Sequence, residues 1–183
     1  MNFTSHKQTV FWTSFTCEPG HILAAATAQG LCYVGSPGGR LEDLNDWIEK
    51  HVPNHHLIRD EVSMHDYVGQ FDEYFRGRRT SFTFPLSLYG TPFQMSVWAT
   101  LQKIPYGQSR SYTDVALDMQ KPKSVRAIAA AIGANPLLIA VPCHRVIGKS
   151  GALTGYRGGL DMKARLLTLE REGITDAFDV HAR

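Results

Sequence analysis

Residues 111–136 read SYTDVALDMQKPKSVRAIAAAIGANP and carry the signals of two short helices separated by a tight turn. Ser111 is a candidate N-cap for a first helix over residues 112–118, in which apolar residues recur at helical spacing. The tripeptide KPK then makes the turn, and Ser124 is a candidate N-cap for a second helix over residues 125–134. Two short helices, a tight turn and cationic residues at the entry to the second helix are typical of a helix-turn-helix.

The second of these helices consists almost entirely of small residues. Its sequence, VRAIAAAIGA, has one charged residue, Arg126, and few of the polar side chains with which a major-groove helix contacts base edges. An alanine-rich surface instead permits the close backbone approach that a narrow minor groove requires. Packing against another helix explains part of this composition, but it does not explain an arginine beside the turn. We therefore expect DNA binding with little readout of base sequence.

The charges of the chain are divided unevenly between its two halves. Residues 1–100 carry 7 Lys/Arg against 10 Asp/Glu, a net charge of −3, whereas residues 101–183 carry 12 against 7, a net charge of +5. A basic half on a protein with a total formal charge of only +2 is the pattern expected of a polyanion binder. The alternative is a solvated surface that happens to be rich in lysine.

Composition indicates an ordinary globular protein with one large domain or two small ones, because 43% of its residues are hydrophobic and 20% are charged. No stretch approaches the roughly 20 apolar residues that span a bilayer, and residues 1–15 lack the pattern of a signal peptide. The 3 cysteines are an odd number at unrelated spacings, which fits reduced thiols in the cytoplasm. We interpret Cys17 and Cys32 as small buried hydrophobic residues.

The N-terminal half mixes strand and helix signals. Two short strands are expected within residues 22–35 around a turn at 29–30, and the alternation of Phe82, Phe84 and Leu86 predicts another strand. Helical apolar spacing predicts helices over Leu41–His51 and residues 66–75. After a boundary at residues 86–90 the chain becomes mostly helical, beginning with a helix capped by Thr91 with Pro92 at its first position.

A cysteine and a histidine are adjacent in the run VPCHR at 141–145. A thiol is a strong nucleophile only as its thiolate, which a nearby imidazole or cation favours. Because adjacent side chains do not face one another on a helix or a strand, Cys143 and His144 cooperate only if the chain turns sharply there. Pro142 suits such a turn at the end of a strand over residues 137–141. The alternative for a lone cysteine beside an apolar run is a buried structural residue.

Five motifs, taken together and in this order, resemble one family, the O6-alkylguanine-DNA alkyltransferases, which are single-use DNA repair proteins. The motifs are GTPFQMSVW (90–98), IPYGQSRSY (104–112), KPKSVRAIAAAIGANP (121–136), VPCHRVIG (141–148) and GYRGGLDMKARLLTLE (155–170). The resemblance is almost continuous over residues 74–170 and looser before them. It implies an α+β protein with an RNase H-like α/β domain over residues 1–88. A mostly helical domain with a helix-turn-helix (winged-helix-like) then follows over residues 89–175, with a tail over residues 176–183.

The resemblance also assigns catalytic roles. Cys143 corresponds to the alkyl acceptor, and His144 and Glu170 correspond to its partners in a Cys–water–His–Glu relay. Asn135 corresponds to the residue that braces the active-site turn, and Tyr112 to the tyrosine that approaches the flipped guanine and the DNA phosphate. The implied reaction transfers the alkyl group of O6-alkylguanine, and of O4-alkylthymine, irreversibly to the cysteine without a cofactor.

Contacts with DNA and with the extruded base are implied as well. Arg126 corresponds to the arginine that enters the duplex in place of the flipped base, and further DNA contacts fall on Lys123, Ser124, Val125 and Ala127. The guanine pocket falls on Val146, Tyr156, Arg157, Ile132 and Leu138. The family often has serine where Arg157 stands, so the backbone contact there transfers more safely than a side-chain role. The expected partner is alkylated double-stranded DNA, bound by a protein that is monomeric in its absence, with no membrane contact.

Some members of the family bind zinc through N-terminal cysteines and histidines. This chain offers Cys32 there, with Thr27 where another ligand is needed, so we expect no zinc and no other metal. Four further histidines, which we interpret as surface residues because no cysteine or carboxylate cluster accompanies them, are His51, His55, His56 and His65.

Two other functions share some of these sequence features. A cysteine hydrolase also uses Cys, His and an acid, but it leaves the helix-turn-helix and the basic half unexplained. A non-catalytic sensor of alkylated DNA with the same fold lacks the acceptor cysteine, whereas Cys143 is present here. The sequence leaves open which alkyl groups are accepted, whether O4-alkylthymine is repaired and whether binding to DNA is cooperative.

Overall fold

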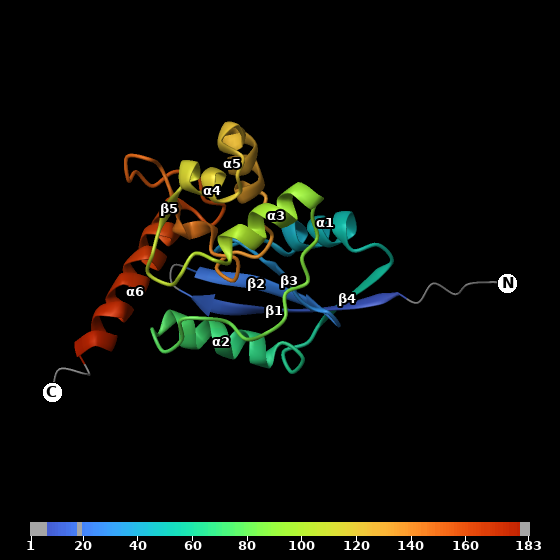
Figure 1. The fold of residues 1–183 in the computed structure, drawn as a ribbon. Helices are drawn as coiled ribbons and strands as arrows, with labels where there is room; N and C mark the ends of the chain where they lie inside the picture. Colours follow the sequence, from blue (N-terminus) through green and yellow to red (C-terminus); the bar gives the residue numbers. More distant parts are fainter. Residues whose placement is uncertain (1–6, 18–19, 180–183) are drawn as a thin grey trace.

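A four-stranded sheet forms the base of the N-terminal half, with the strand order β3-β2-β1-β4. β1 (Gln8–Cys17), β2 (Gly20–Thr27) and β3 (Gly30–Val34) pair antiparallel, and β4 (His55–Arg59) lies parallel to β1. This computed structural model describes residues 7–17 and 20–179, and its side chains up to residue 173 (Figure 1). The sequence patterns predict β2 and β3 but miss β1 and β4.

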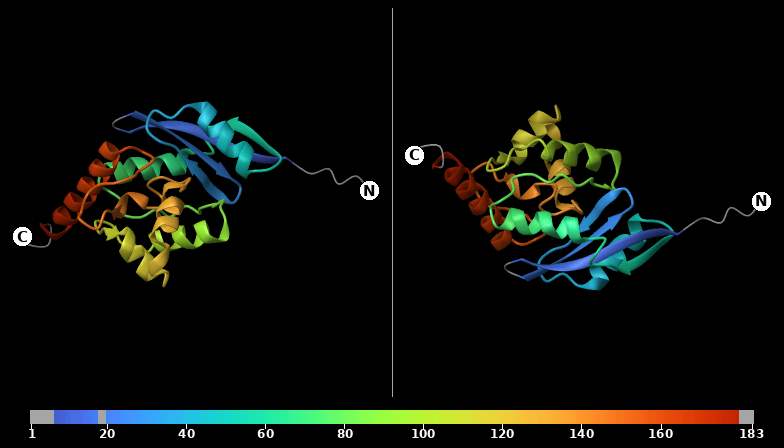
Figure 2. Two further views of the ribbon diagram at one scale, coloured as in Figure 1. Left: turned by 90° about the horizontal axis from the view of Figure 1, so that it is seen from above. Right: turned by 90° about the horizontal axis from the view of Figure 1, so that it is seen from below.

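Residues of β2 alternate between two hydrophobic clusters, as expected for a strand that is covered on both faces. Ala24 and Ala26 belong to the cluster that contains α2 (His65–Phe75) and the C-terminal half, whereas Leu23 and Ala25 belong to the cluster of α1 (Leu41–His51). Figure 2 shows the C-terminal half on one side of the sheet. The two helices match their predicted ranges to within one residue.

The strand predicted from Phe82, Phe84 and Leu86 is wrong. This segment runs beside β3 and forms one isolated bridge, between Leu86 and Leu31. Because Pro85 has no N–H to donate, the segment does not form a continuous ladder with β3. The carbonyl of Pro85 still accepts a hydrogen bond from the N–H of Leu31. The two phenylalanine rings pack against one another instead (centroids 5.1 Å apart), so their alternation reflects aromatic packing.

Short helices make up most of the C-terminal half. They are α3 (Pro92–Leu101), α4 (Tyr112–Asp118), the 3-10 turn η1 (Pro122–Ser124), α5 (Val125–Gly133), the 3-10 turn η2 (Cys143–Arg145) and α6 (Leu160–Asp179). Thr91 and Ser111 cap α3 and α4 through capping boxes, as predicted. Ser124 does not cap α5 with its side chain, because η1 leads directly into the helix. No helix in residues 7–17 and 20–179 has both the length and the apolarity needed to cross a membrane.

A second sheet of two short strands connects two distant segments of this half. β5 (Arg110–Ser111) pairs parallel with β6 (Val146–Ile147), which directly follows η2. The strand predicted over residues 137–141 is wrong, because only Leu137 forms a bridge and a turn follows. α6 continues through the first part of the expected tail, and residues 180–183 lie outside the described residues, as do residues 1–6 of the segment searched for a signal peptide.

Candidate active site

Asn135 holds the turn that precedes Cys143. Its amide nitrogen lies 3.2 Å from Leu137 O, 3.0 Å from Val141 O and 3.0 Å from Cys143 Sγ, and its Oδ1 accepts from Leu137 N at 2.9 Å. Inside this turn Ile139 has φ 72°, in the left-handed region that a β-branched residue avoids at a cost of about 1–3 kcal/mol. The side chain of Asn135 therefore stabilises a strained turn and contacts the sulfur, as its expected bracing role requires.

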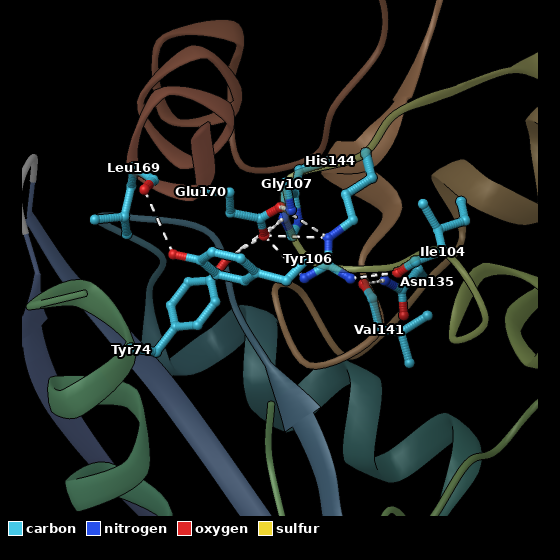
Figure 3. A network of polar contacts seen from close by, with 10 residues as sticks. Tyr74, Ile104, Tyr106, Gly107, Asn135, Val141, His144, Leu169 and Glu170 are labelled. Carbon is cyan, nitrogen blue, oxygen red and sulfur yellow. Dashed lines mark hydrogen bonds and ion pairs between the residues drawn. The ribbon is translucent and has the colours of Figure 1, made fainter. Parts of the chain in front are cut away.

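His144, which directly follows Cys143 in the chain, forms a fully buried pair with Glu170 (Figure 3). His144 Nε2 lies 2.8 Å from Glu170 Oε1, and both side chains are 0% exposed. His144 Nδ1 is buried and has no hydrogen-bond partner among the described residues. With Nε2–H donating to the carboxylate, the lone pair of Nδ1 is the free basic site of the imidazole.

Glu170 is surrounded by hydrogen-bond donors. Arg145 donates from Nε and Nη2. The backbone N–H of Gly107 donates to Oε2 at 2.9 Å, and the hydroxyl of Tyr74 donates to Oε1 at 2.5 Å (Figure 3). Burial alone would raise the pKa of Glu170, but hydrogen bonds and charge from His144 and Arg145 lower it to about 2. The carboxylate is therefore an anion at every physiological pH.

Cys143 and His144 rest in their neutral forms. Burial raises the pKa of the Cys143 thiol, and this effect outweighs the opposing hydrogen bond from Asn135 and the charges of Arg157 and Lys163. Burial also lowers the pKa of His144, against the opposing effect of Glu170. In this arrangement the imidazole is a neutral base, and the anionic carboxylate of Glu170 can stabilise its protonated form.

Lys163 connects α6 by hydrogen bonds to the segment that follows Cys143. Its Nζ is fully buried and donates to Val146 O at 2.5 Å and to Thr154 O at 2.7 Å. The pairing of β5 with β6 brings Tyr112, the first residue of α4, to the same segment, where its hydroxyl donates to Thr154 O at 3.3 Å. Tyr112 and Val146, two of the predicted site residues, are thus connected to the same segment through Thr154, which accepts from both Tyr112 and Lys163.

Arg157 ties the loop after Thr154 to the N-terminal half. Its Nη2 donates to Val34 O at 2.8 Å and to Asn135 O at 3.1 Å, and its guanidinium lies 5.6 Å from the centroid of the Tyr33 ring. The neighbouring Tyr156 packs edge-on against His144, with its hydroxyl buried and without a partner among the described residues. This loop therefore lies over Cys143, which is only 3% exposed.

The remaining predicted pocket residues are part of the packed interior. Ile132 and Leu138 are 3% and 1% exposed and belong to the same hydrophobic cluster as Cys143. They do not line an open pocket wall in this conformation.

α5 has one buried and one exposed face. Ile128 and Ala131 are buried under the helix, whereas Arg126 and Ala127 are exposed at its start together with Lys123 of η1. Ser124 and Val125 are half-buried between these faces. Three of the residues predicted to contact DNA, Lys123, Arg126 and Ala127, are therefore exposed at the turn between α4 and α5.

Two of the four histidines considered as metal ligands, His51 and His55, bond backbone carbonyl groups. The Nδ1 atoms of His51 and His55 bond the carbonyl oxygens of Trp47 and Val52, and no group of three His, Cys, Asp or Glu residues in the described part of the chain has the arrangement of a metal site. Cys32 is buried and donates to Ala25 O. The absence of zinc stays a prediction.

Three residues of the site escaped the sequence interpretation. The sequence predicts Tyr74 only as part of the apolar face of a helix. Arg145 and Lys163 lie within the quoted motifs, but the sequence analysis assigns neither of them a role. One signal was readable: Lys163 and Glu170 stand seven residues apart, a spacing that places them on one face of a helix such as α6.

Comparison with known proteins places both halves of the chain. The family model of the 6-O-methylguanine DNA methyltransferase ribonuclease-like domain matches residues 10–88, and the model of the DNA binding domain matches residues 92–172. The inducible methylated-DNA–protein-cysteine methyltransferase of Bacillus subtilis is 45% identical over 172 residues, which cover 94% of this chain and 96% of that protein. A relative in Methanosarcina acetivorans with the same enzyme name is 42% identical over 163 residues, 88% of this chain and 98% of that protein.

Solved structures agree with these matches. The crystal structure of Mycobacterium tuberculosis OGT in complex with DNA superposes with a TM-score of 0.76 at 37% identity, covering 89% of this chain and 94% of that one. A ribonuclease-like domain followed by a DNA-binding domain is the architecture of the DNA methyltransferases of this class. The chain belongs to the 6-O-methylguanine DNA methyltransferase family, which confirms the resemblance and the α+β fold class.

Proposed function

We propose that Cys143 accepts the alkyl group of O6-alkylguanine in duplex DNA, irreversibly and once per molecule. As a member of its family, the chain is a methylated-DNA–protein-cysteine methyltransferase that repairs DNA by alkyl transfer to a cysteine. The observation that supports Cys143 as the acceptor is the buried His144–Glu170 pair, whose histidine directly follows Cys143 in the chain, while Asn135 contacts the sulfur. Cys17 and Cys32 are buried in the strands β1 and β3, and we assign them no part in the transfer.

The reaction begins with proton transfer. His144 takes the thiol proton at Nδ1 through a water molecule, while Glu170 orients the imidazole and stabilises its charged form. The sulfur attacks the alkyl carbon in line, so that an S–C bond forms as the C–O6 bond breaks and its electron pair leaves with guanine. Tyr112 donates a hydrogen bond or a proton to the leaving base, which lowers the cost of its developing negative charge. A thioether resists hydrolysis, so each molecule acts once.

The target atom is inaccessible in a stacked duplex, and the base has to be flipped out at a cost of a few kcal/mol. We assign this step to the exposed start of α5. Arg126 fills the space that the base leaves, and Lys123 and the backbone around Ser124, Val125 and Ala127 contact phosphates. The smooth exposed face of the helix and the basic C-terminal half support binding through the minor groove.

Several finer features belong to the same proposal. The base pocket is formed by Val146, Tyr156 and Arg157, with Ile132 and Leu138 in the packed interior behind it. The division into residues 1–88 and 89–175, the monomeric state without DNA and a cytoplasmic location, where thiols remain reduced, complete it.

The experiment is intact mass spectrometry after incubation with duplex DNA containing O6-methylguanine. Each molecule gains one methyl group, about 14 Da, and peptide mapping locates it on Cys143, because that thiol is the activated nucleophile. Cys143→Ala gains nothing, although it remains folded and binds DNA. Several repaired bases per molecule, or a methyl group on Cys17 or Cys32, would exclude the mechanism; an unmodified protein that binds alkylated DNA would be a sensor.

A further inference from the structure

Tyr74 brings the N-terminal half into contact with the catalytic pair. It lies on α2, is 1% exposed, and its hydroxyl donates to Glu170 Oε1 at 2.5 Å while lying 3.5 Å from His144 Nε2 (Figure 3). The bond to Glu170 spans 96 residues of sequence.

We propose that Tyr74 is a positioning residue of the alkyl transfer, whose hydroxyl shares Glu170 Oε1 with His144 and thereby sets the basicity of the imidazole. The proposal rests on the proposed function, in which His144 is the base that takes the thiol proton. It assigns the N-terminal half a part in the chemistry.

The hydroxyl is needed for this contact, while the ring alone satisfies the packing. The Tyr74 ring lies 5.3 Å from the Phe82 ring and 6.0 Å from the Tyr106 ring (centroid distances), in an aromatic cluster that a phenylalanine would fill equally well. The oxygen alone reaches out of this cluster into the polar site. Burial and the neighbouring carboxylate hold the pKa of Tyr74 well above its usual range, so it remains a donor at every working pH.

The physical effect of the hydroxyl follows from how the carboxylate is shared. Glu170 Oε1 accepts from Tyr74, from His144 and from Arg145, and each donor draws negative charge from the oxygen. A carboxylate with a delocalised charge attracts the imidazolium less strongly and does not take its proton. Loss of the hydroxyl concentrates the charge on the imidazole side, so the pKa of His144 rises.

The other groups around the pair do not account for this effect. Arg145 and Lys163 are cations whose charges oppose protonation of His144, and Tyr106 lies close to Glu170 without bonding to it. The titratable and charged groups facing the pair, from every packed element, are Cys143, Arg145, Lys163, Arg157, Tyr74, Tyr106 and Tyr156. All of them stay in place in the variants described below, apart from the hydroxyl that each variant removes.

The test compares Tyr74→Phe with Tyr106→Phe in the full-length protein. Both remove one hydroxyl from the same aromatic cluster, but the hydroxyl of Tyr106 faces Leu169 O at 3.4 Å. The first measurement is the pH dependence of the single-turnover rate on an O6-methylguanine duplex at saturating protein. The second is an NMR titration of His144 with labelled histidine.

In Tyr74→Phe we expect the acidic limb of the rate profile and the pKa of His144 to move up by about 0.5–1 pH unit, as loss of a hydrogen bond to a charged group predicts. Tyr106→Phe leaves both within about 0.2 pH unit of wild type. A profile of Tyr74→Phe that superposes on wild type, or an equal shift in both variants, overturns the proposal. A missing mass gain on Cys143 in wild type instead overturns the proposed function.

A second variant guards against misfolding of Tyr74→Phe. Incorporation of 3-fluorotyrosine at position 74 keeps the ring and its hydroxyl and makes the hydroxyl a stronger donor. The pKa of His144 then shifts in the opposite direction, downward, and a shift upward or none at all rejects the assignment.

Discussion

Arg126 is the one charged residue of α5 and is exposed at its first turn. If it occupies the space of the flipped base, Arg126→Ala slows repair of duplex DNA by orders of magnitude even at saturating protein, because extrusion itself is impaired. Reaction with free O6-benzylguanine, if that base is accepted, changes little, because a free base needs no extrusion. Single-turnover kinetics on both substrates measure the difference.

Lys123 offers the matched control for this prediction. It is exposed beside the same turn, and as a phosphate contact its loss weakens binding and lowers the salt slope by about 1. Raising the concentration of Lys123→Ala restores the full rate. An Arg126→Ala variant that recovers in the same way shows that Arg126 is a phosphate contact, and the base-flipping role is then wrong.

Single residues of the site were predictable where chemistry and motif coincide. Cys143, His144 and Glu170 carry groups whose reactivity is recognisable, and the structure pairs His144, the neighbour of Cys143 in the chain, with Glu170. Tyr74 was not predictable, because an apolar stripe on a helix describes which face is buried and not what a hydroxyl at its end will meet. That partner comes from α6, far along the chain.

Elements were predictable where capping residues mark their ends. α3 and α4 begin at the residues that Thr91 and Ser111 indicate, because their side chains satisfy N–H groups of the first turn. Strand patterns failed where proline or tight turns interrupt hydrogen bonding, at residues 82–86 and 137–141. Alternation and apolar runs report burial, and burial alone does not distinguish a ladder from an irregular packed segment.

Arg157 holds the loop after Thr154 in place through two hydrogen bonds, one of them to the N-terminal half. Arg157→Ser, the residue that the family often has there, removes the hydrogen bonds to Val34 O and Asn135 O. We expect the variant to lose about 1–2 kcal/mol of stability and to open the loop more easily. The single-turnover rate on O6-benzylguanine DNA then rises relative to the rate on O6-methylguanine DNA.

The ratio of the rates on O6-benzylguanine and O6-methylguanine DNA separates the effect of loop opening from the effect of the positive charge of Arg157. Arg157 also favours the Cys143 thiolate, so its loss slows transfer of both adducts alike and cancels in the ratio. Arg157→Lys keeps the charge without the planar fork and serves as the control. An unchanged ratio in Arg157→Ser means that the loop does not select adduct size.

The two halves of the molecule share one interior. The main hydrophobic cluster contains Ile22 and Leu31 of the sheet together with Val97 of α3 and Cys143 itself. Hydrogen bonds from Tyr74 and Arg157 cross the same boundary. The N-terminal half therefore supports the active site directly, and destabilising it is expected to affect the reaction.

Acid unfolding tests this shared interior. Glu170 has its pKa lowered from 4.5 to about 2, and the pKa of His144 is lowered from 6.5 by burial. In the unfolded chain both groups take up protons at their ordinary pKa values, so the unfolded state binds more protons than the folded state as the pH falls. Stability is therefore complete above pH about 6.5 and declines as the pH falls, with Glu170 contributing about 3 kcal/mol that is lost between pH 4.5 and 2.

Urea denaturation at a series of pH values from 7 to 3 measures the decline. Glu170→Gln is less stable than wild type at pH 7, because it leaves Arg145 without its buried anion, and its stability changes less between pH 4.5 and 3. Asp60→Asn is the matched control: hydrogen bonds from Ser63 lower the pKa of Asp60 as well, but this carboxylate is on the surface, so the pH dependence stays close to that of wild type. If Glu170→Gln shows the same slope as wild type below pH 4.5, the buried carboxylate is not the group that links acid to unfolding, and the ionic state assigned to the catalytic pair is wrong.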